Sequence, residues 1–231
     1  MWFESLPAGK SWAALWSEYV RCACGGIQPI DRPCPACGAP VQTCAEYFIR
    51  EDNGTEHRVI YALMGAEGRY EDYVFLQMIE REWLRPIMDA DRFLNISEKN
   101  RPSARAIVVL VFWTYFETRI ERLVRETTKK LPDSVMDDLL RRYSSVGSRL
   151  DRLYRILYST TYLSDLRELG YHEVASLLTR IQERRNEFSH GRPEAIDDLL
   201  VEQLVEGLRD EHDSWIAVFN KRLADATNAN N

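Results

Sequence analysis

Apolar residues recur every three to four positions over most of the chain after Arg69, and this spacing predicts amphipathic helices. The first helical stretch carries Leu76, Ile79 and Trp83, and Pro86 marks its kink or its end. Later helices are expected over residues 103–131, 132–143, 147–158, 171–190 and 194–223. The polar residues 226–231 are expected to form a disordered tail. The chain is therefore predicted to be mainly α-helical.

The N-terminal part of the chain has a different pattern. Residues 12–19 have the apolar spacing of a short amphipathic helix. Residues 46–51 and 56–63 read as two strands that flank Asn53-Gly54, a dipeptide that favours a tight hairpin turn. Glycines near position 66 suggest the boundary, so residues 1–66 are predicted as one unit and residues 67–225 as a helical domain.

All five cysteines lie between positions 22 and 44, and four of them form two close pairs, Cys22-x-Cys24 and Cys34-x-x-Cys37. This spacing is typical of zinc ligands, and four thiolates leave no open position for a catalytic water. We therefore expect a structural Zn²⁺ and no catalytic metal. The first pair is tighter than the usual C-x-x-C, so Cys44 remains an alternative ligand. Cysteine pairs followed by a β-hairpin have the layout of a zinc ribbon.

Two charged residues fall on predicted apolar stripes. Arg185 lies on the stripe of the helix that ends at His190, and Glu117 falls between Trp113 and Ile120 in the longest apolar helix. A guanidinium in such a position must be paired or must face a cleft. A carboxylate there needs a cation partner or has a raised pKa. We therefore expect Glu117 and Arg185 to pair across a helix–helix contact.

His190 stands at the predicted end of its helix, directly before Gly191, a C-terminal stop, and close to Pro193. A lone histidine at a helix end is more often a residue that satisfies backbone carbonyls than a catalytic group. The imidazole is also the side chain that exchanges a proton near neutral pH. Arg185 and Asn186, five and four positions earlier, favour the second interpretation.

Residues Arg185-Asn186-Glu187-Phe188-Ser189-His190 resemble the R-x4–6-H motif of the HEPN superfamily, in its RN-x-x-x-H form. A long hydrophobic helix with an internal acid, Glu117, precedes the motif, as the resemblance requires. The similarity covers roughly residues 70–225. It implies a helical bundle that forms a homodimer and brings two motifs into one cleft, where active members cut RNA without a metal ion. The zinc ribbon is an addition that the core family does not require.

The resemblance also implies roles for the site residues. The 2′-hydroxyl of RNA would attack the phosphate, His190 would transfer the proton, and Arg185 would hold the non-bridging oxygens. Asn186 would orient the sugar or the histidine, and Glu117 would fix Arg185 or tune the site. The role implied for the protein is a toxin of a toxin–antitoxin system or an effector of phage defence. An antitoxin or another regulatory protein would be its partner.

The composition of the chain bears on its class, its location and its possible binding surface. The chain is 45% hydrophobic and 29% charged, as in globular proteins, and no apolar run reaches the roughly 20 residues of a membrane-spanning helix. Without a visible signal peptide, a cytoplasmic location is expected. The net charge of −6 argues against a broad nucleic-acid-binding surface, although arginines cluster locally around Arg185. His172 and His212 are expected on the solvated surface.

Two alternatives to the ribonuclease hypothesis remain open. The first is a non-catalytic HEPN-like module that binds RNA, a nucleotide or a partner protein. The second is an interaction protein in which the helices form a structural dimer and the ribbon recognises protein or DNA. The acidic charge balance favours the second alternative, and the intact motif favours the enzyme.

Overall fold

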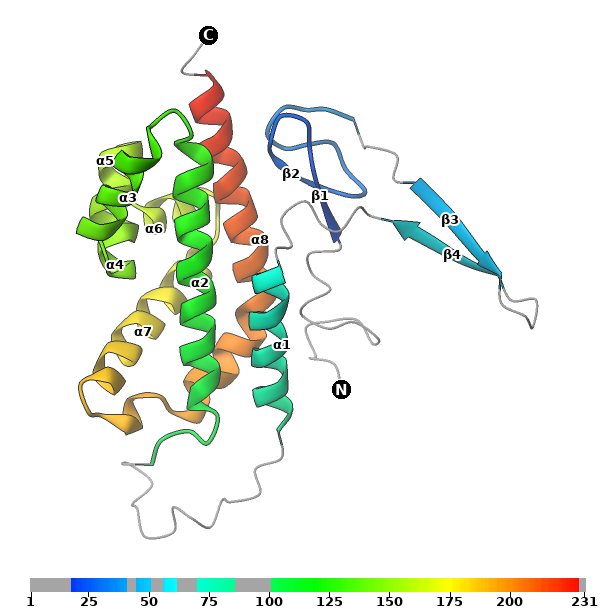
Figure 1. The fold of residues 1–231 in the computed structure, drawn as a ribbon. Coiled ribbons are helices and arrows are strands. Elements are labelled where there is room, and N and C mark those ends of the chain that lie inside the picture. Colours follow the sequence, from blue (N-terminus) through cyan, green and yellow to red (C-terminus); the bar gives the residue numbers. More distant parts are fainter. Residues whose placement is uncertain (1–17, 41–44, 51–55, 62–69, 86–100, 229–231) are drawn as a thin grey trace.

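The computed structural model describes residues 18–40, 45–50, 56–61, 70–85 and 101–228, and the chain is mainly helical (Figure 1). A small two-part β region lies at its N-terminal side. Within the described residues, no helix combines the length and the apolar character needed to cross a membrane. The boundary predicted near residue 66, the turn Asn53-Gly54, Cys44 and Pro86 all fall outside the described residues.

Two long helices form the centre of the helical part. These are α2 (Ala106–Thr127) and α8 (Asp198–Asn228), which pack against each other, while α1 (Tyr70–Leu84) packs on α2 (Figure 1). Around them lie α3 (Asp133–Arg142), α4 (Val146–Ser148), a π-helical turn (Arg149–Leu153), α5 (Tyr154–Tyr158), α6 (Tyr162–Glu168) and α7 (His172–Ser189). The predicted helices over residues 103–131, 132–143 and 171–190 are confirmed with small shifts at their ends. The single helix predicted over residues 147–158 is instead divided into α4, the π-helical turn and α5.

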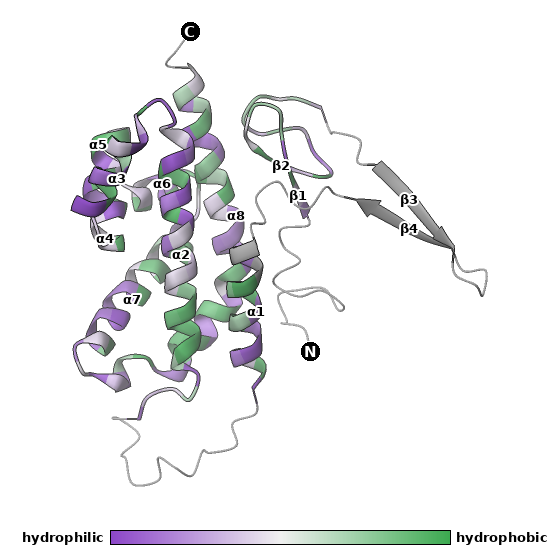
Figure 2. Ribbon diagram, viewed as in Figure 1, coloured by the Kyte–Doolittle hydropathy of each residue, from purple (hydrophilic) through white to green (hydrophobic). Residues whose placement is uncertain are grey.

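Helix α2 supplies most of the core because it is covered by neighbours on several sides. Its apolar residues from Val108 to Val124 are largely buried, and hydrophobic residues run along much of its length (Figure 2). Aromatic rings fill the space between α2 and its neighbours, as where Phe116 meets Tyr162 of α6 edge to face. The spacing of apolar residues predicted one buried stripe along α2, whereas in the structure α2 is buried on several sides.

Three ion pairs lie inside this core. Arg119 of α2 donates to Glu211 of α8 over 2.6 Å, and both side chains are almost fully buried, at 0% and 1% exposure. Arg122 donates to Asp72 of α1 through both terminal nitrogens. The third pair joins Arg222 of α8 to Asp165 of α6. Each pair therefore ties a different helix to α2 or α8.

The β region consists of two antiparallel hairpins. Strands β1 (Tyr19–Arg21) and β2 (Ile27–Pro29) pair with Val20 opposite Gln28, and strands β3 (Ala45–Arg50) and β4 (Glu56–Tyr61) form the second pair. The second hairpin confirms the strands predicted around residues 46–51 and 56–63. Tyr19 begins a strand, so the helix expected over residues 12–19 is wrong at this residue, and residues 12–17 of that segment lie outside the described residues.

The first hairpin packs directly onto α8. The side chain of Asn220 accepts a hydrogen bond from the Ile27 N–H and donates one to the Ile27 carbonyl, both over 2.7 Å. The Tyr19 hydroxyl donates to Asp213, and Arg209 donates to Glu18, each over 2.7 Å. The β region and the helices are therefore joined by specific polar contacts on one side of α8.

This contact overturns the prediction for His212. His212 is only 1% exposed, and its ring centre lies 5.6 Å from that of Tyr19. Its charged sequence neighbours suggested a solvated face, but the β region covers that side of α8. His172, at the start of α7, is exposed as expected.

Two further differences concern short or terminal segments. Helix α6 was not predicted; it is seven residues long and begins after Thr161, whose hydroxyl accepts from the Ser164 N–H. The C-terminal helix continues to Asn228, so residues 226–228 are helical and were wrongly predicted as part of a disordered tail. Leu223, a turn earlier, packs next to Gly25 of the β region, which favours continuation of the helix.

Candidate metal centre and polar pocket

Four cysteine sulfurs meet at one point of the β region. Cys22 and Cys24 follow β1, and Cys34 and Cys37 follow β2. All four sulfurs lie within 4.8 Å of one another. The shortest separations join one cysteine from each sequence pair: 3.6 Å for Cys22–Cys37 and 3.8 Å for Cys24–Cys34. Each sulfur of one pair therefore has a sulfur of the other pair as a close neighbour, so the two pairs are interleaved.

These separations fit a tetrahedral metal ion. Thiolates at about 2.3 Å from a zinc ion have sulfur–sulfur distances of about 3.8 Å. Cys22 and Cys34 are buried, whereas Cys24 and Cys37 are exposed. The backbone N–H of Ala39 lowers the pKa of the Cys37 thiol, whereas burial raises the pKa of the Cys24 and Cys34 thiols. In the described part of the chain, the group holds cysteines alone, without histidine or carboxylate.

Tight turns on glycine position the sulfurs. Gly25 and Gly38 both have a left-handed backbone, with φ of +89° and +72°. The turn at Gly25 brings its N–H within 2.8 Å of the Cys22 carbonyl, and the turn at Gly38 does the same for Cys34 over 2.7 Å. Each cysteine pair is thereby folded back so that both of its sulfurs point to the same side.

The end of α7 carries the second candidate site. Gly191 has φ of +89°; its N–H donates to the Phe188 carbonyl, and the N–H of Arg192 donates to the Glu187 carbonyl. These bonds form a Schellman motif, so the stop predicted at Gly191 is confirmed. His190 is the last residue before this turn, and its side chain is exposed.

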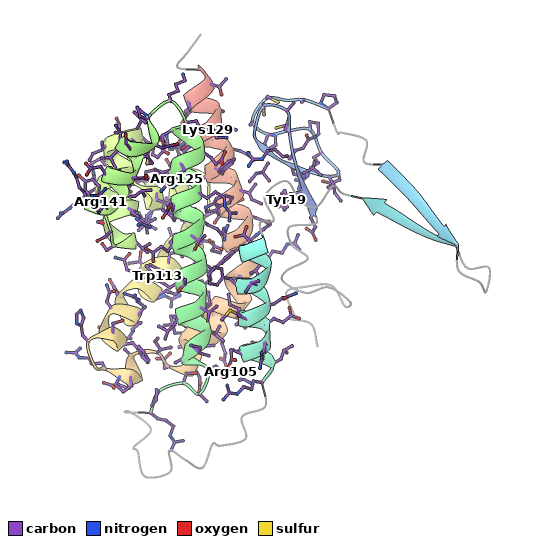
Figure 3. The ribbon with its side chains drawn as sticks, viewed as in Figure 1. Tyr19, Arg105, Trp113, Arg125, Lys129 and Arg141 are labelled. Carbon is purple, nitrogen blue, oxygen red and sulfur yellow. The ribbon has the colours of Figure 1, made fainter. Side chains whose placement is uncertain are left out.

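A polar pocket of about 340 Å³ opens between α2, the start of α4 and α7. Figure 3 places Trp113 on the side of α2 that faces α7, at this pocket. Arg185 and Asn186 line it from α7, and Glu117 lines it from α2. The remaining lining residues are Ser144, Ser145, Val146, Gly147 and Gln182. The structure therefore brings three of the four predicted site residues to one pocket.

His190 is not among the residues that line this pocket. It is the C-cap of α7, one helical turn beyond Asn186, so the two residues lie on the same side of the helix end. His190 also remains bonded to that turn, because its N–H donates to the Asn186 carbonyl over 3.0 Å. The fourth predicted site residue is therefore adjacent to the pocket along α7 and exposed.

Glu117 does not pair with Arg185 as expected. Its carboxylate lies 3.2 Å from a terminal nitrogen of Arg149, in the π-helical turn, and Arg149 also approaches Glu121 at 3.5 Å. Spacing along α2 placed Glu117 within the apolar stripe, but its side chain is 37% exposed, so the residue lies at the edge of the buried surface. The partner could not be inferred because Arg149 belongs to a π-helical turn that has no regular helical spacing.

Arg185 is half-buried and keeps its charge available to the pocket. Among the described residues, no carboxylate lies within ion-pair distance of its guanidinium, and its one hydrogen bond goes to the adjacent Asn186 over 3.4 Å. The neighbouring Arg184 and Arg192 instead approach Glu187, at 3.7 and 3.9 Å. A half-buried guanidinium beside a pocket can bind an anion.

Gln182 and Gly147 are site residues that the sequence prediction missed. A Cβ on Gly147 would lie 2.6 Å from the Gln182 side-chain nitrogen, so the Gln182 amide occupies the space beside the Gly147 backbone. The position of Gln182, one turn before Asn186 on the same helix face, is the signal that could have identified it.

Comparison of the chain with protein-family models, curated proteins and solved structures gave no match.

Proposed function

We propose that this protein is a metal-independent endoribonuclease of the HEPN type, which acts as a homodimer and carries a structural Zn²⁺ on Cys22, Cys24, Cys34 and Cys37. The RN-x-x-x-H segment ends a helix of a mainly helical fold, and its arginine and asparagine line a polar pocket. The four interleaved sulfurs support the zinc assignment. Reduced metal-binding thiols suit the cytoplasm, which we propose as its location.

The observation that carries the proposal is the free charge of Arg185. A guanidinium that already paired with a carboxylate would bind phosphate weakly, because the anion would have to displace its partner. Glu117 pairs with Arg149, and Glu187 approaches the two flanking arginines, so Arg185 has no such competitor among the described residues. Arg185 can therefore offer two parallel N–H groups to the non-bridging phosphate oxygens.

The roles of the other residues follow from their places on α7. His190, exposed one turn beyond the pocket, would take the proton from the 2′-hydroxyl of RNA or give one to the departing 5′-oxygen. Asn186, between the two, would orient the ribose. Glu117 pairs with Arg149 and is therefore not a direct partner of Arg185. Its role would be to position α4 and to set the charge of the pocket wall.

The chemistry requires a 2′-hydroxyl and leaves defined products. The oxygen of the 2′-hydroxyl forms a bond to phosphorus, the bond to the 5′-oxygen breaks, and that oxygen gains a proton. The products then end in a 2′,3′-cyclic phosphate and a 5′-hydroxyl, and DNA is not cut. We propose a biological role as a toxin or phage-defence effector that is restrained by an antitoxin or another regulatory protein.

Substitution of Arg185 tests the proposal. Arg185→Ala is expected to lower the rate of RNA cleavage in EDTA at least a hundredfold, because transition-state contacts of this kind contribute about that much. Arg184→Ala is the matched control, since Arg184 is exposed, adjacent and paired with Glu187. Equal rates for the wild type and Arg185→Ala would contradict the proposal, as would cleavage that EDTA abolishes and Mg²⁺ restores.

A non-catalytic module that binds RNA or a nucleotide is the alternative. The position of His190 outside the pocket lining favours it, because a binding site needs the arginine and the pocket alone. In that case, RNA would bind to the wild type and Arg185→Ala would bind less RNA, while no preparation would cut it.

A further inference from the structure

The pocket between α2, α4 and α7 has the size and the lining of a site for one nucleotide. Its volume of about 340 Å³ lies at the lower end of the range for small-ligand sites. Trp113, Ser144 and Ser145 line it together with two residues that carry side-chain amides, Gln182 and Asn186. Trp113 is 5% exposed, so its ring is held by packing. Amides and hydroxyls both donate and accept hydrogen bonds, as the edge of a nucleobase does.

The Gln182 amide lies against Gly147 of α4, and its donor and acceptor are not used within the described part of the chain. Gly147 lets the backbone of α4 come so close that a Cβ there would lie 2.6 Å from the Gln182 nitrogen. Within the described part of the chain, no group hydrogen-bonds the Gln182 side chain. The amide therefore lies against α4 at the pocket wall, and its donor and acceptor remain available to a ligand.

The positions of the site residues along α7 set the order in which they would meet an RNA strand. Gln182, Asn186 and His190 follow one another at intervals of four residues, about 6 Å apart along the helix axis. Arg185 lies between the first and the last of them. A phosphate held by Arg185 therefore has His190 on one side along α7 and the Gln182 side of the pocket on the other.

We propose that this pocket binds the nucleobase next to the cleaved phosphate, with Gln182 as the residue that determines which base is accepted. The inference rests on the proposed ribonuclease function and adds a base preference to it. Single-stranded RNA suits such a site, because its unstacked bases can enter a pocket and present their hydrogen-bonding edges. Gln182 positions the base and takes no part in the proton transfers.

A random RNA library cut by the wild type, followed by sequencing of the product ends, measures the preference. We expect one base, or one class of base, to be enriched at one position beside the cut. Gln182→Ala is expected to reduce this enrichment about tenfold, since a lost base-edge contact has that order of effect. Gly147→Ala is expected to change the preferred base or weaken the preference, because its methyl group displaces the amide.

Gln203→Ala is the matched control. Gln203 is also a glutamine of intermediate exposure that lines a pocket, but that pocket lies between α7 and α8 and contains neither Arg185 nor Asn186. The base preference of this variant should equal that of the wild type. An enrichment that is unchanged in Gln182→Ala, or equally reduced in Gln203→Ala, would overturn the inference while RNA cleavage itself stood.

A second readout separates this inference from the ribonuclease proposal. The four nucleoside monophosphates are titrated separately into the wild type and Gln182→Ala, and binding is followed by NMR shifts. Different affinities among the four in the wild type, made equal by Gln182→Ala, support the base site even if no RNA is cut. Equal affinities of both proteins for all four nucleotides would overturn it.

Discussion

At the scale of single residues, Arg119 is a fully buried charge in the core of the described helices. Its guanidinium lies between the rings of Tyr115 and Trp215, at 4.8 and 4.7 Å from their centres, and bonds Glu211. Sequence spacing indicated one polar position in α2, Glu117, and missed Arg119. The reason is that the prediction assigned a single buried stripe to α2, whereas the fold covers the helix on several sides. The partial burial of Arg185, in contrast, followed directly from its stripe on α7.

Replacement of Arg119 should therefore be costly. Arg119→Met leaves the Glu211 carboxylate buried without its cation, and we expect the free energy of unfolding to fall by about 3–5 kcal/mol. Arg155→Met is the control, because Arg155 and its partner Asp151 are both exposed on one helix, where such pairs contribute little. Urea denaturation measures both. Equal losses in the two variants would mean that the buried pair does not stabilise the core in this way.

His212 gives the stability a pH dependence. Burial holds the pKa of His212 well below its usual value, and Arg119 and Arg209 act in the same direction. The unfolded chain takes up the proton near pH 6.5, while the folded chain does not, so the free energy of unfolding falls as the pH drops below about 6.5. The largest slope expected from this group is about 1.4 kcal/mol per pH unit.

Urea denaturation of the wild type and His212→Gln, at several pH values from about 7 to about 5.5, isolates this contribution. Burial raises the pKa of Glu211 and Asp213, which gives an opposite slope at lower pH in both proteins. We therefore expect the variant to lose less stability than the wild type over this range. A parallel decline of both proteins would show that His212 takes up its proton in the folded state as well.

At the scale of elements, the regular spacing of apolar residues predicted the long helices. It did not predict the short or irregular segments. Helix α7 extends from His172 to Ser189, within one residue of the expectation at each end, because its apolar stripe and its glycine stop agree. The turn at Arg149–Leu153 is π-helical, and no sequence rule places such a turn. This turn carries Arg149, which pairs with Glu117. Arg185 was therefore the wrong prediction for the partner, because the π-helical backbone changes where Arg149 lies.

The glycine turn after His190 allows the site to be disturbed through the backbone alone. Gly191 and Gly170 have nearly the same positive φ, and nothing lies within 4 Å of a Cβ on either. Gly191→Ala and Gly170→Ala should therefore each cost about 1–2 kcal/mol of stability, from backbone strain. Only Gly191→Ala should also lower the rate of RNA cleavage, because only that turn fixes His190. A similar effect of the two variants on cleavage would contradict this role.

At the scale of the whole molecule, the cysteine-bearing hairpin is joined to the helices through α8. Asn220 bonds the backbone of Ile27 twice, and Tyr19 bonds Asp213, so order in the β region should stabilise α8. The cysteine spacing predicted the metal-binding group, and the structure brings the same four sulfurs together. The docking onto α8 could not be predicted, because it depends on single polar side chains spaced along a long helix.

Metal analysis tests this organisation. We expect about one zinc ion per chain in the wild type, from the tetrahedral four-thiolate arrangement. Cys34→Ser should lose the metal and lower the Tm, because the loops that Cys34 anchors would no longer hold the hairpin against α8. Cys44→Ser is the control and should retain both the metal and the Tm. Loss of zinc in Cys44→Ser would instead make Cys44 one of the ligands.

We propose that the end of α7 cuts RNA by means of Arg185 and His190. The most direct test measures the cleavage of one RNA, in EDTA, by the wild type, His190→Ala and His172→Ala, with the chemical ends of the products identified. His172 is exposed at the other end of the same helix. We predict 2′,3′-cyclic phosphate ends from the wild type and from His172→Ala, and no products from a folded His190→Ala. Undiminished cleavage by His190→Ala, or no cleavage by the wild type, would contradict the claim.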